Sequence, residues 1–155
     1  MRLITIFHNR TYKQMITMNE DSTYEKPRTA RRVDELFQEA MNEGNLDKAM
    51  ALYDDNAVFV QEPGKPALTG LENIRQALEQ FQAIKPKLKV EVMQFVEADD
   101  VAFFTLKWEI RGTSADGEDV FVTSYDGNVV KRQPDGTWKT IIDNPFHAHH
   151  IGLMD

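Results

Sequence analysis

The hydrophobic period of the chain changes at Pro86, and this change constrains the fold more than any other feature. Apolar residues recur at helical spacing before Pro86, whereas residues 87–92 alternate between charged and apolar side chains. The alternation continues in segment 101–111, where one face consists of Phe104, Leu106, Trp108 and Ile110. Alternation of this kind is typical of strands with one buried face. The sequence therefore predicts an α+β domain, with helices first and a curved antiparallel sheet after them.

Three helices are predicted in the first half of the chain. Segment 29–42 has apolar residues at helical spacing, and Gly44 follows it at the left-handed position that ends many helices. Asn45 is predicted to cap a second helix, whose apolar face would run from Leu46 to Tyr53. A strand is then expected at residues 57–60.

A capping box and a hairpin turn mark the later boundaries. Thr69 and Glu72 have the spacing at which a hydroxyl and a carboxylate satisfy the free N–H groups of a helix start, which predicts the third helix. Long strands are expected at 118–132 and 137–144, joined by a turn at Pro134-Asp-Gly136.

Composition excludes several classes of function. A net charge of −7 argues against nucleic-acid binding, which depends on clustered Lys and Arg. No apolar run approaches the roughly 20 residues that span a bilayer, so no membrane association is expected. The chain has no cysteine and no apolar leader of signal-peptide length, and a cytoplasmic location is expected. The predicted organisation is an N-terminal arm at 1–27, one domain at 28–146 and a tail at 147–155.

Several motifs together resemble the NTF2-like superfamily, over roughly residues 29–146. They are Gly44-Asn-Leu-Asp47, Leu52-Tyr-Asp-Asp-Asn-Ala-Val-Phe59, Leu68-Thr-Gly70, Lys131-Arg-Gln-Pro-Asp-Gly-Thr-Trp138 and Asp143-Asn144. The sequence is most similar to the small SnoaL-like, domain-of-unknown-function (DUF4440-type) branch. This resemblance implies a cone in which three helices close against a strongly curved sheet. The branch has no single agreed activity.

Ketosteroid isomerases of the same superfamily supply a mechanistic template. Their catalytic aspartate precedes a proline, and the matching run Val60-Gln-Glu-Pro63 puts Glu62 at the position of the base. By the same alignment Phe37 replaces a tyrosine donor and Asn128 replaces an aspartic acid donor. An amide donates a hydrogen bond at any pH, but Phe37 cannot donate, so the oxyanion site of the template is incomplete. The structural alternative for Glu62 is a solvated carboxylate on a loop.

Asp143 is the second candidate base. The resemblance implies that Lys139, Ile141 and Asp143 point into the cavity, and SnoaL-type polyketide cyclases are thought to use an inward aspartate without metal or cofactor. Glu62, Asp143 and Asn128 are therefore the predicted catalytic residues. The alternative is that Asp143 caps a turn or forms an ion pair with a neighbouring basic side chain such as Lys139.

The predicted ligand-binding residues would line the same cone. They are Phe37, Tyr53, Val60, Phe104, Leu106, Trp108, Asp126, Ile141 and His147. The aromatic members fit an ordinary core at least as well as a binding site. His147, His149 and His150 are a weak metal motif on a tail, so no metal site is predicted.

Two classes of function remain open. The favoured hypothesis is a cofactor-free protein that binds an apolar or aromatic small molecule and, if catalytic, acts as an acid/base isomerase or cyclase beside a carbonyl. The alternative is a non-catalytic dimerisation or association module of the same fold. A homodimer is expected in either case, through an outer sheet face formed by Phe121, Val129, Trp138, Thr140 and Ile142.

Overall fold

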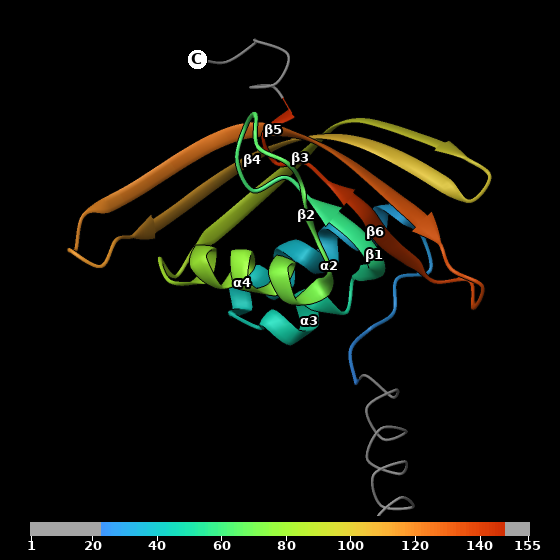
Figure 1. Cartoon of the computed structure of the whole chain (residues 1–155), viewed down its shortest axis with the longest axis horizontal. Helices are drawn as coiled ribbons and strands as arrows, with labels where there is room; N and C mark the ends of the chain where they lie inside the picture. The colour runs from blue at the N-terminus through green and yellow to red at the C-terminus, as the bar shows by residue number, and fades with distance from the viewer. Residues whose placement is uncertain (1–22, 148–155) are drawn as a thin grey trace, which may run out of the picture.

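Helices and one curled sheet make up the computed structural model, which describes residues 23–147 (Figure 1). The elements in chain order are α2 (Ala30–Glu43), α3 (Leu46–Met50), β1 (Tyr53–Phe59), β2 (Leu68–Thr69), α4 (Leu71–Gln82), β3 (Lys87–Ala98), β4 (Val101–Thr113), β5 (Asp119–Arg132) and β6 (Trp138–Asp143). Residues 1–22 of the predicted arm and 148–155 of the predicted tail, including His149 and His150, lie outside the described residues. In the described part of the chain, no helix is long and apolar enough to cross a membrane.

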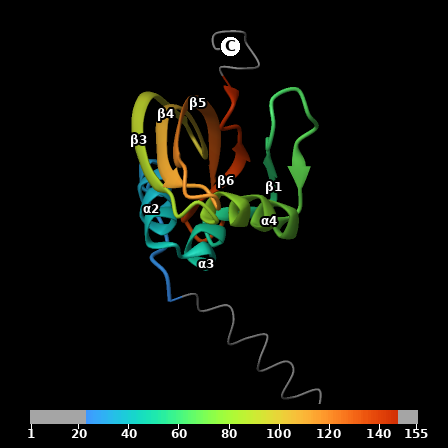
Figure 2. The ribbon, with the colours of Figure 1, turned by 90° about the vertical axis from the view of Figure 1, so that its left-hand side faces the viewer.

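The sheet has six strands in the order β2-β1-β6-β5-β4-β3. Strands β3 to β6 form the antiparallel meander that the alternating pattern predicts. Strand β1, however, pairs with β6 in parallel, so the sheet is mixed rather than purely antiparallel. The chain reaches β6 from β1 only after α4 and the whole meander, and this long return allows the parallel pairing. The helices gather on one face of the sheet, which curls around them without closing (Figure 1, Figure 2).

The signals at the end of α2 and the start of α3 are confirmed. Gly44 ends α2 with a φ of 71°, a left-handed conformation that a glycine adopts without strain. The side chain of Asn45 accepts a hydrogen bond from the Lys48 backbone N–H at 3.0 Å, which makes it the N-cap of α3. These two adjacent caps turn the chain sharply between the helices.

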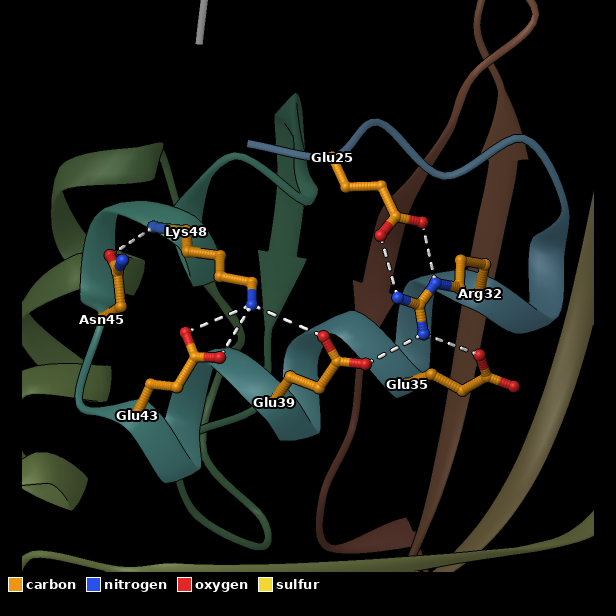
Figure 3. Close-up of polar contacts among 7 residues, drawn as sticks. All are labelled: Glu25, Arg32, Glu35, Glu39, Glu43, Asn45 and Lys48. Atoms are coloured by element: carbon orange, nitrogen blue, oxygen red, sulfur yellow. Dashed lines mark hydrogen bonds and ion pairs between the residues drawn. The ribbon is translucent and has the colours of Figure 1, made fainter. Parts of the chain in front are cut away.

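A network of ion pairs joins the segment before α2, α2 itself and α3 on the surface (Figure 3). Arg32 contacts Glu25 at 2.8 Å and Glu39 at 2.9 Å, and Lys48 contacts Glu39 at 3.5 Å and Glu43 at 3.1 Å. Exposed ion pairs typically contribute less than about 1 kcal/mol each. We therefore regard the network as aligning these segments rather than as a main source of stability.

Two predicted boundaries in this region are wrong. Tyr53 begins β1 instead of extending the helical face from Leu46, because α3 ends at Met50. Thr69 lies in β2, and Gly70 takes the N-cap position of α4 without a side-chain hydrogen bond. The hydroxyl of Thr69 is thus not the cap that the sequence predicted, because Gly70 stands between Thr69 and the first helical residue, Leu71.

The interior of the sheet follows the alternation of β4. Its inward residues are all buried: Ala102, Phe104, Leu106, Trp108 and Ile110. Three of them, Ala102, Phe104 and Leu106, share one core cluster with Leu36 of α2, whereas Ile74 of α4 packs in a second cluster with residues of β1. The predicted inward stripe of β4 is therefore confirmed.

A β-bulge in β6 changes the side of the sheet to which its residues point. Thr140 pairs with Val130, but Ile142 pairs with Val129, so β6 has one extra residue at this point. Trp138 and Thr140 are consequently buried, whereas Ile142 is 39% exposed. The prediction that Trp138 and Thr140 lie on the outer face is wrong, because the bulge shifts the alternation by one residue.

Candidate functional site

A cavity lies between the helices and the inner face of the sheet. The centre of a water-sized sphere can occupy about 70 Å³ of it. All the empty space, with the open mouth included, amounts to about 700 Å³. The smaller volume corresponds to roughly five water molecules, which is room for a small enclosed group. Its polar lining residues are Asp34, Tyr53, Asp126, Asn128, Thr140 and Asp143. Its apolar lining residues are Phe37, Met41, Phe59, Leu78, Phe81, Leu88, Val90, Leu106, Trp108, Ile110 and Pro145.

Asp143, at the end of β6, receives a hydrogen bond from the hydroxyl of Tyr53 at the start of β1. Asp143 is 7% exposed and Tyr53 is 2% exposed. Burial raises the pKa of Asp143 to about 6, and the hydrogen bond from Tyr53 opposes this shift. Burial and the neighbouring Asp143 also raise the pKa of Tyr53, so its hydroxyl keeps its proton and remains the donor. Asp143 is therefore mainly ionised at neutral pH.

Asp126 and Asn128 point into the cavity from alternate positions of β5. The Asn128 amide nitrogen donates to Oδ2 of Asp126 at 3.2 Å, and its oxygen accepts from the Asn144 backbone N–H at 3.1 Å. Oδ1 of Asp126 is buried and has no hydrogen-bond partner among the described residues. Burial raises the pKa of Asp126 well above its usual value, and the charges of Asp143 and Asp34 add to this effect. Asp126 therefore keeps its proton to a higher pH than an exposed aspartic acid does.

Asp34 completes the acidic group from α2. The residue as a whole is half-buried, but its Oδ2 exposes less than 1 Å² and has no hydrogen-bond partner in the described part of the chain. Burial and the charge of Asp143 raise the pKa of Asp34 to about 7. Hydrogen bonding by the Asn128 side chain lowers this pKa and so opposes the shift. About half of the Asp34 carboxyl groups are ionised at neutral pH.

Together these residues form a cavity with three carboxyl groups, and burial raises the pKa of each. Such a set suits proton transfer, because one carboxylate can accept a proton while a neutral acid donates a hydrogen bond. Within residues 23–147, no group of three or more His, Cys, Asp or Glu side chains is arranged to hold a metal ion.

Several residues expected at the site do line the cavity. They are Asn128, Asp143, Phe37, Tyr53, Leu106, Trp108 and Asp126. Asp143 arrives there through the β-bulge rather than through simple alternation with Lys139 and Ile141. Their roles in binding or catalysis remain predictions.

Glu62 does not lie at the cavity. Strand β1 ends at Phe59, and Glu62 follows on an exposed turn, where its backbone oxygen accepts from the Lys65 N–H at 3.3 Å. Val60 is also outside the lining, and its N–H donates to the Asp143 backbone oxygen at 2.9 Å. The motif match predicted that Glu62 is the base of the cavity, and this prediction is corrected, because β1 ends before Glu62 and the side chain is exposed.

Three further candidates lie elsewhere. Phe104 is completely buried in the core, with its ring 4.9 Å from that of Phe95. Ile141 is the extra residue of the bulge and does not line the cavity. His147 packs against Gly127, where an added Cβ would come within 3.0 Å of its Cγ.

Asp34 is a cavity residue that the sequence prediction missed. It precedes Phe37 by three positions and Met41 by seven, and all three line the cavity. Residues at this spacing share one face of a helix. The signal was a carboxylate on the face of α2 that also carries the predicted ligand-binding Phe37.

A family model described as the SnoaL-like domain matches residues 33–141. No curated protein matches the sequence at a significant level. The matched residues include the whole of the sheet except the last two residues of β6.

Solved structures share the fold at low sequence identity. A ketosteroid isomerase-like protein from Erwinia carotovora atroseptica is 21% identical with a TM-score of 0.65, over 73% of this chain and 88% of that one. A protein from Xanthomonas campestris named for the calcium/calmodulin-dependent protein kinase II association domain is 23% identical with a TM-score of 0.59, over 71% and 79%. A protein from Catenulispora acidiphila in complex with S-DNPA is 17% identical with a TM-score of 0.61, over 80% and 94%.

Proposed function

The chain belongs to the SnoaL-like domain family with the NTF2-like fold, and from this premise we propose that it binds a small, largely apolar molecule and performs acid/base chemistry beside a carbonyl group. The observation that carries the proposal is the pair of buried carboxyl oxygens, Oδ2 of Asp34 and Oδ1 of Asp126, that lack a partner in the described part of the chain. Buried polar atoms without partners are rare and costly, so they indicate a ligand that satisfies them.

Asp143 is the proposed base. Its carboxylate is ionised at neutral pH, it is shielded from bulk water, and its pKa of about 6 is close to the working range of a general base. It would remove a proton from the carbon next to the carbonyl, and the electrons of that C–H bond would form the enolate.

Asp126 is the proposed donor to the enolate oxygen. The Asn128 amide nitrogen only donates, and its orientation is fixed because the Asn128 oxygen accepts from the Asn144 N–H. In its protonated form, Asp126 therefore carries the proton on Oδ1, the oxygen without a partner in the described part of the chain. Return of the proton from Asp143 to another carbon completes an isomerisation. In a cyclisation the enolate carbon instead attacks a second carbonyl carbon, the π electrons of that carbonyl move to its oxygen, and Asp143 returns the proton to this oxygen.

Exchange of the protons next to a carbonyl tests this proposal without knowledge of the natural substrate. We would follow incorporation of deuterium into cyclohexanone and 1-indanone by NMR, with the wild type, Asp143→Asn and Glu62→Gln. General bases typically contribute about 10²–10⁴-fold, so Asp143→Asn should lose most of the acceleration. Glu62→Gln is the matched control and should retain it. No acceleration by the wild type, or equal rates in Asp143→Asn, would contradict the proposal.

The second candidate function is association through the outer face of the sheet. The helices cover only the inner face (Figure 1), and Phe121 and Ile142 are 52% and 39% exposed on the other. A second copy of the chain is the proposed occupant, although the face lacks the expected Trp138 and Thr140. Sedimentation velocity at micromolar concentration should show a dimer that Ile142→Lys dissociates. A monomeric wild type would exclude this function.

A further inference from the structure

The charges around the cavity are all of one sign. Asp34, Asp126 and Asp143 line it, and no Lys, Arg or His does so among the described residues. Glu35 on α2 is a further acidic neighbour, and its charge raises the pKa of Asp34 as well. Strands β3 and β4 and helix α4 contribute only uncharged side chains to the lining. The cavity therefore has no internal cation to balance its carboxylates.

No cation in the lining that residues 23–147 provide relieves the repulsion among these carboxyl groups. The charge of Asp143 raises the pKa of both Asp34 and Asp126, and Asp34 raises that of Asp126 as well. A positively charged ligand would balance the same carboxylates and release protons on binding. An anionic ligand would add a further like charge to a buried site and is disfavoured.

The remainder of the lining suits an organic cation. Phe37 and Tyr53 form an edge-to-face pair with centroids 6.2 Å apart, and Trp108 contributes a third ring to the wall. Aromatic rings attract ammonium groups and also cover apolar carbon. A bare metal ion is a poorer fit, because no group of acidic side chains in residues 23–147 has metal-binding geometry.

We infer that the ligand of this cavity bears a protonated amine, which donates hydrogen bonds to the buried Oδ2 of Asp34 and to the Asp143 carboxylate while its apolar part packs on the aromatic wall. An ammonium group has several donors and no acceptor, so it suits oxygens that lack donors. The inference rests on the proposed function only in requiring that the same cavity open to a small molecule. If both hold, the substrate is an amino-carbonyl compound.

Three probes of the same size separate the possible ligand charges. Benzylamine, benzyl alcohol and benzoate would be titrated by calorimetry at pH 7.5 into the wild type, Asp34→Asn and Asp116→Asn. Asp116 is an exposed loop residue and provides the matched control. Benzylamine should bind at least about tenfold more tightly than benzyl alcohol, and benzoate should not bind. Asp34→Asn should weaken benzylamine about tenfold or more, and Asp116→Asn should not.

Proton release provides a second measurement that a surface charge effect does not reproduce. Titration of benzylamine in two buffers with different ionisation heats should show that the wild type releases a fraction of a proton per bound amine, since Asp34 is about half protonated near pH 7. Absence of release, or equal affinity for the alcohol, would overturn the inference. If Asp34→Asn does not fold, the wild-type preference for benzylamine over benzyl alcohol and the wild-type proton release decide.

The results also distinguish this inference from the proposed function. Exchange of cyclohexanone protons without binding of benzylamine would overturn the amine and leave the acid/base function standing. Binding of benzylamine with proton release, but without carbonyl exchange, would support the amine and contradict the acid/base function. Absence of both would reject the two together.

Discussion

The hydroxyl of Tyr53, at the start of β1, donates a hydrogen bond to Oδ2 of Asp143, at the end of β6. The two residues are far apart in the sequence, and the parallel pairing of β1 with β6 brings their strands together. This contact keeps one carboxyl of the cavity ionised while burial favours the protonated form in all three. The ionised state of Asp143 therefore depends on the parallel pairing of β1 with β6.

Removal of the Tyr53 hydroxyl should shift the pH dependence of the proposed reaction. The hydrogen bond lowers the pKa of Asp143 against the effect of burial, so Tyr53→Phe should raise that pKa above about 6. The acidic limb of the rate profile for carbonyl proton exchange should move to higher pH. Tyr125→Phe, on the opposite face of the sheet, is the control. An unchanged limb in Tyr53→Phe would show that Asp143 is not the base.

Stability should fall as the pH rises from about 4 to about 7. Burial raises the folded-state pKa of Asp34 from 3.8 to about 7 and that of Asp143 to about 6, so the folded protein binds more protons than the unfolded chain in this window. The destabilisation is absent below the unfolded pKa and complete above the folded one. Because one pKa unit corresponds to about 1.4 kcal/mol, the two shifts together predict a loss on the order of 7 kcal/mol across the whole window.

Urea unfolding between pH 5 and pH 8 measures this dependence. Asp34→Asn should flatten the slope, because the amide does not ionise, and Asp116→Asn should leave it unchanged. A free energy of unfolding that rises with pH across this range would contradict the assigned burial of the carboxyl groups.

Local signals predicted the parts of the fold that local structure determines. Gly44 and Asn45 fix a helix end and a helix start through contacts within a few residues. The alternation of β4 is uninterrupted, so all its inward residues except Ala102 were predicted. Thr69, in contrast, satisfies a local capping pattern, but Gly70 takes the N-cap position of α4. The capping pattern thus misplaces the helix start by one residue.

The candidate site was less predictable for two different reasons. Asp143 was expected in the cavity, but on the basis of a regular alternation along β6. The bulge at Ile141 interrupts this alternation, and a single extra residue leaves no mark in the sequence. Asp34 had a visible signal, its helical spacing with Phe37 and Met41. Whether such a carboxylate is solvated or buried depends on what packs against the helix, which one sequence does not reveal.

Two substitutions on either side of the bulge test the observed orientation of β6. Trp138 is 2% exposed, so Trp138→Ala should lower the free energy of unfolding by about 3–5 kcal/mol. Ile142 is 39% exposed on the opposite face, and Ile142→Ala should cost less than about 1 kcal/mol. Urea unfolding at sub-micromolar protein avoids a contribution from association. A larger loss of stability in Ile142→Ala than in Trp138→Ala would contradict the observed orientation and support the simple alternation that the sequence predicted.

Two strand glycines provide the last test, because they differ only in what an added methyl group would meet. A Cβ on Gly112 of β4 would lie 2.5 Å from the backbone oxygen of Ile84, which already accepts from the Thr113 N–H at 3.0 Å. Backbone atoms in such a contact cannot move independently, so Gly112→Ala should cost about 1–3 kcal/mol of stability. A Cβ on Gly127 would meet only the His147 side chain at 3.0 Å, and that ring can rotate away.

We therefore expect Gly127→Ala to cost clearly less than Gly112→Ala in urea unfolding. The contact between Ile84 and Gly112 holds the end of β4 against the connection from α4 to β3, and β3 and β4 together contribute five of the residues that line the cavity. Gly112→Ala should for this reason also weaken benzylamine binding. Equal stability of the two variants would mean that this connection is not closely packed against β4, and the cavity wall would then lack the rigidity that a specific ligand site requires.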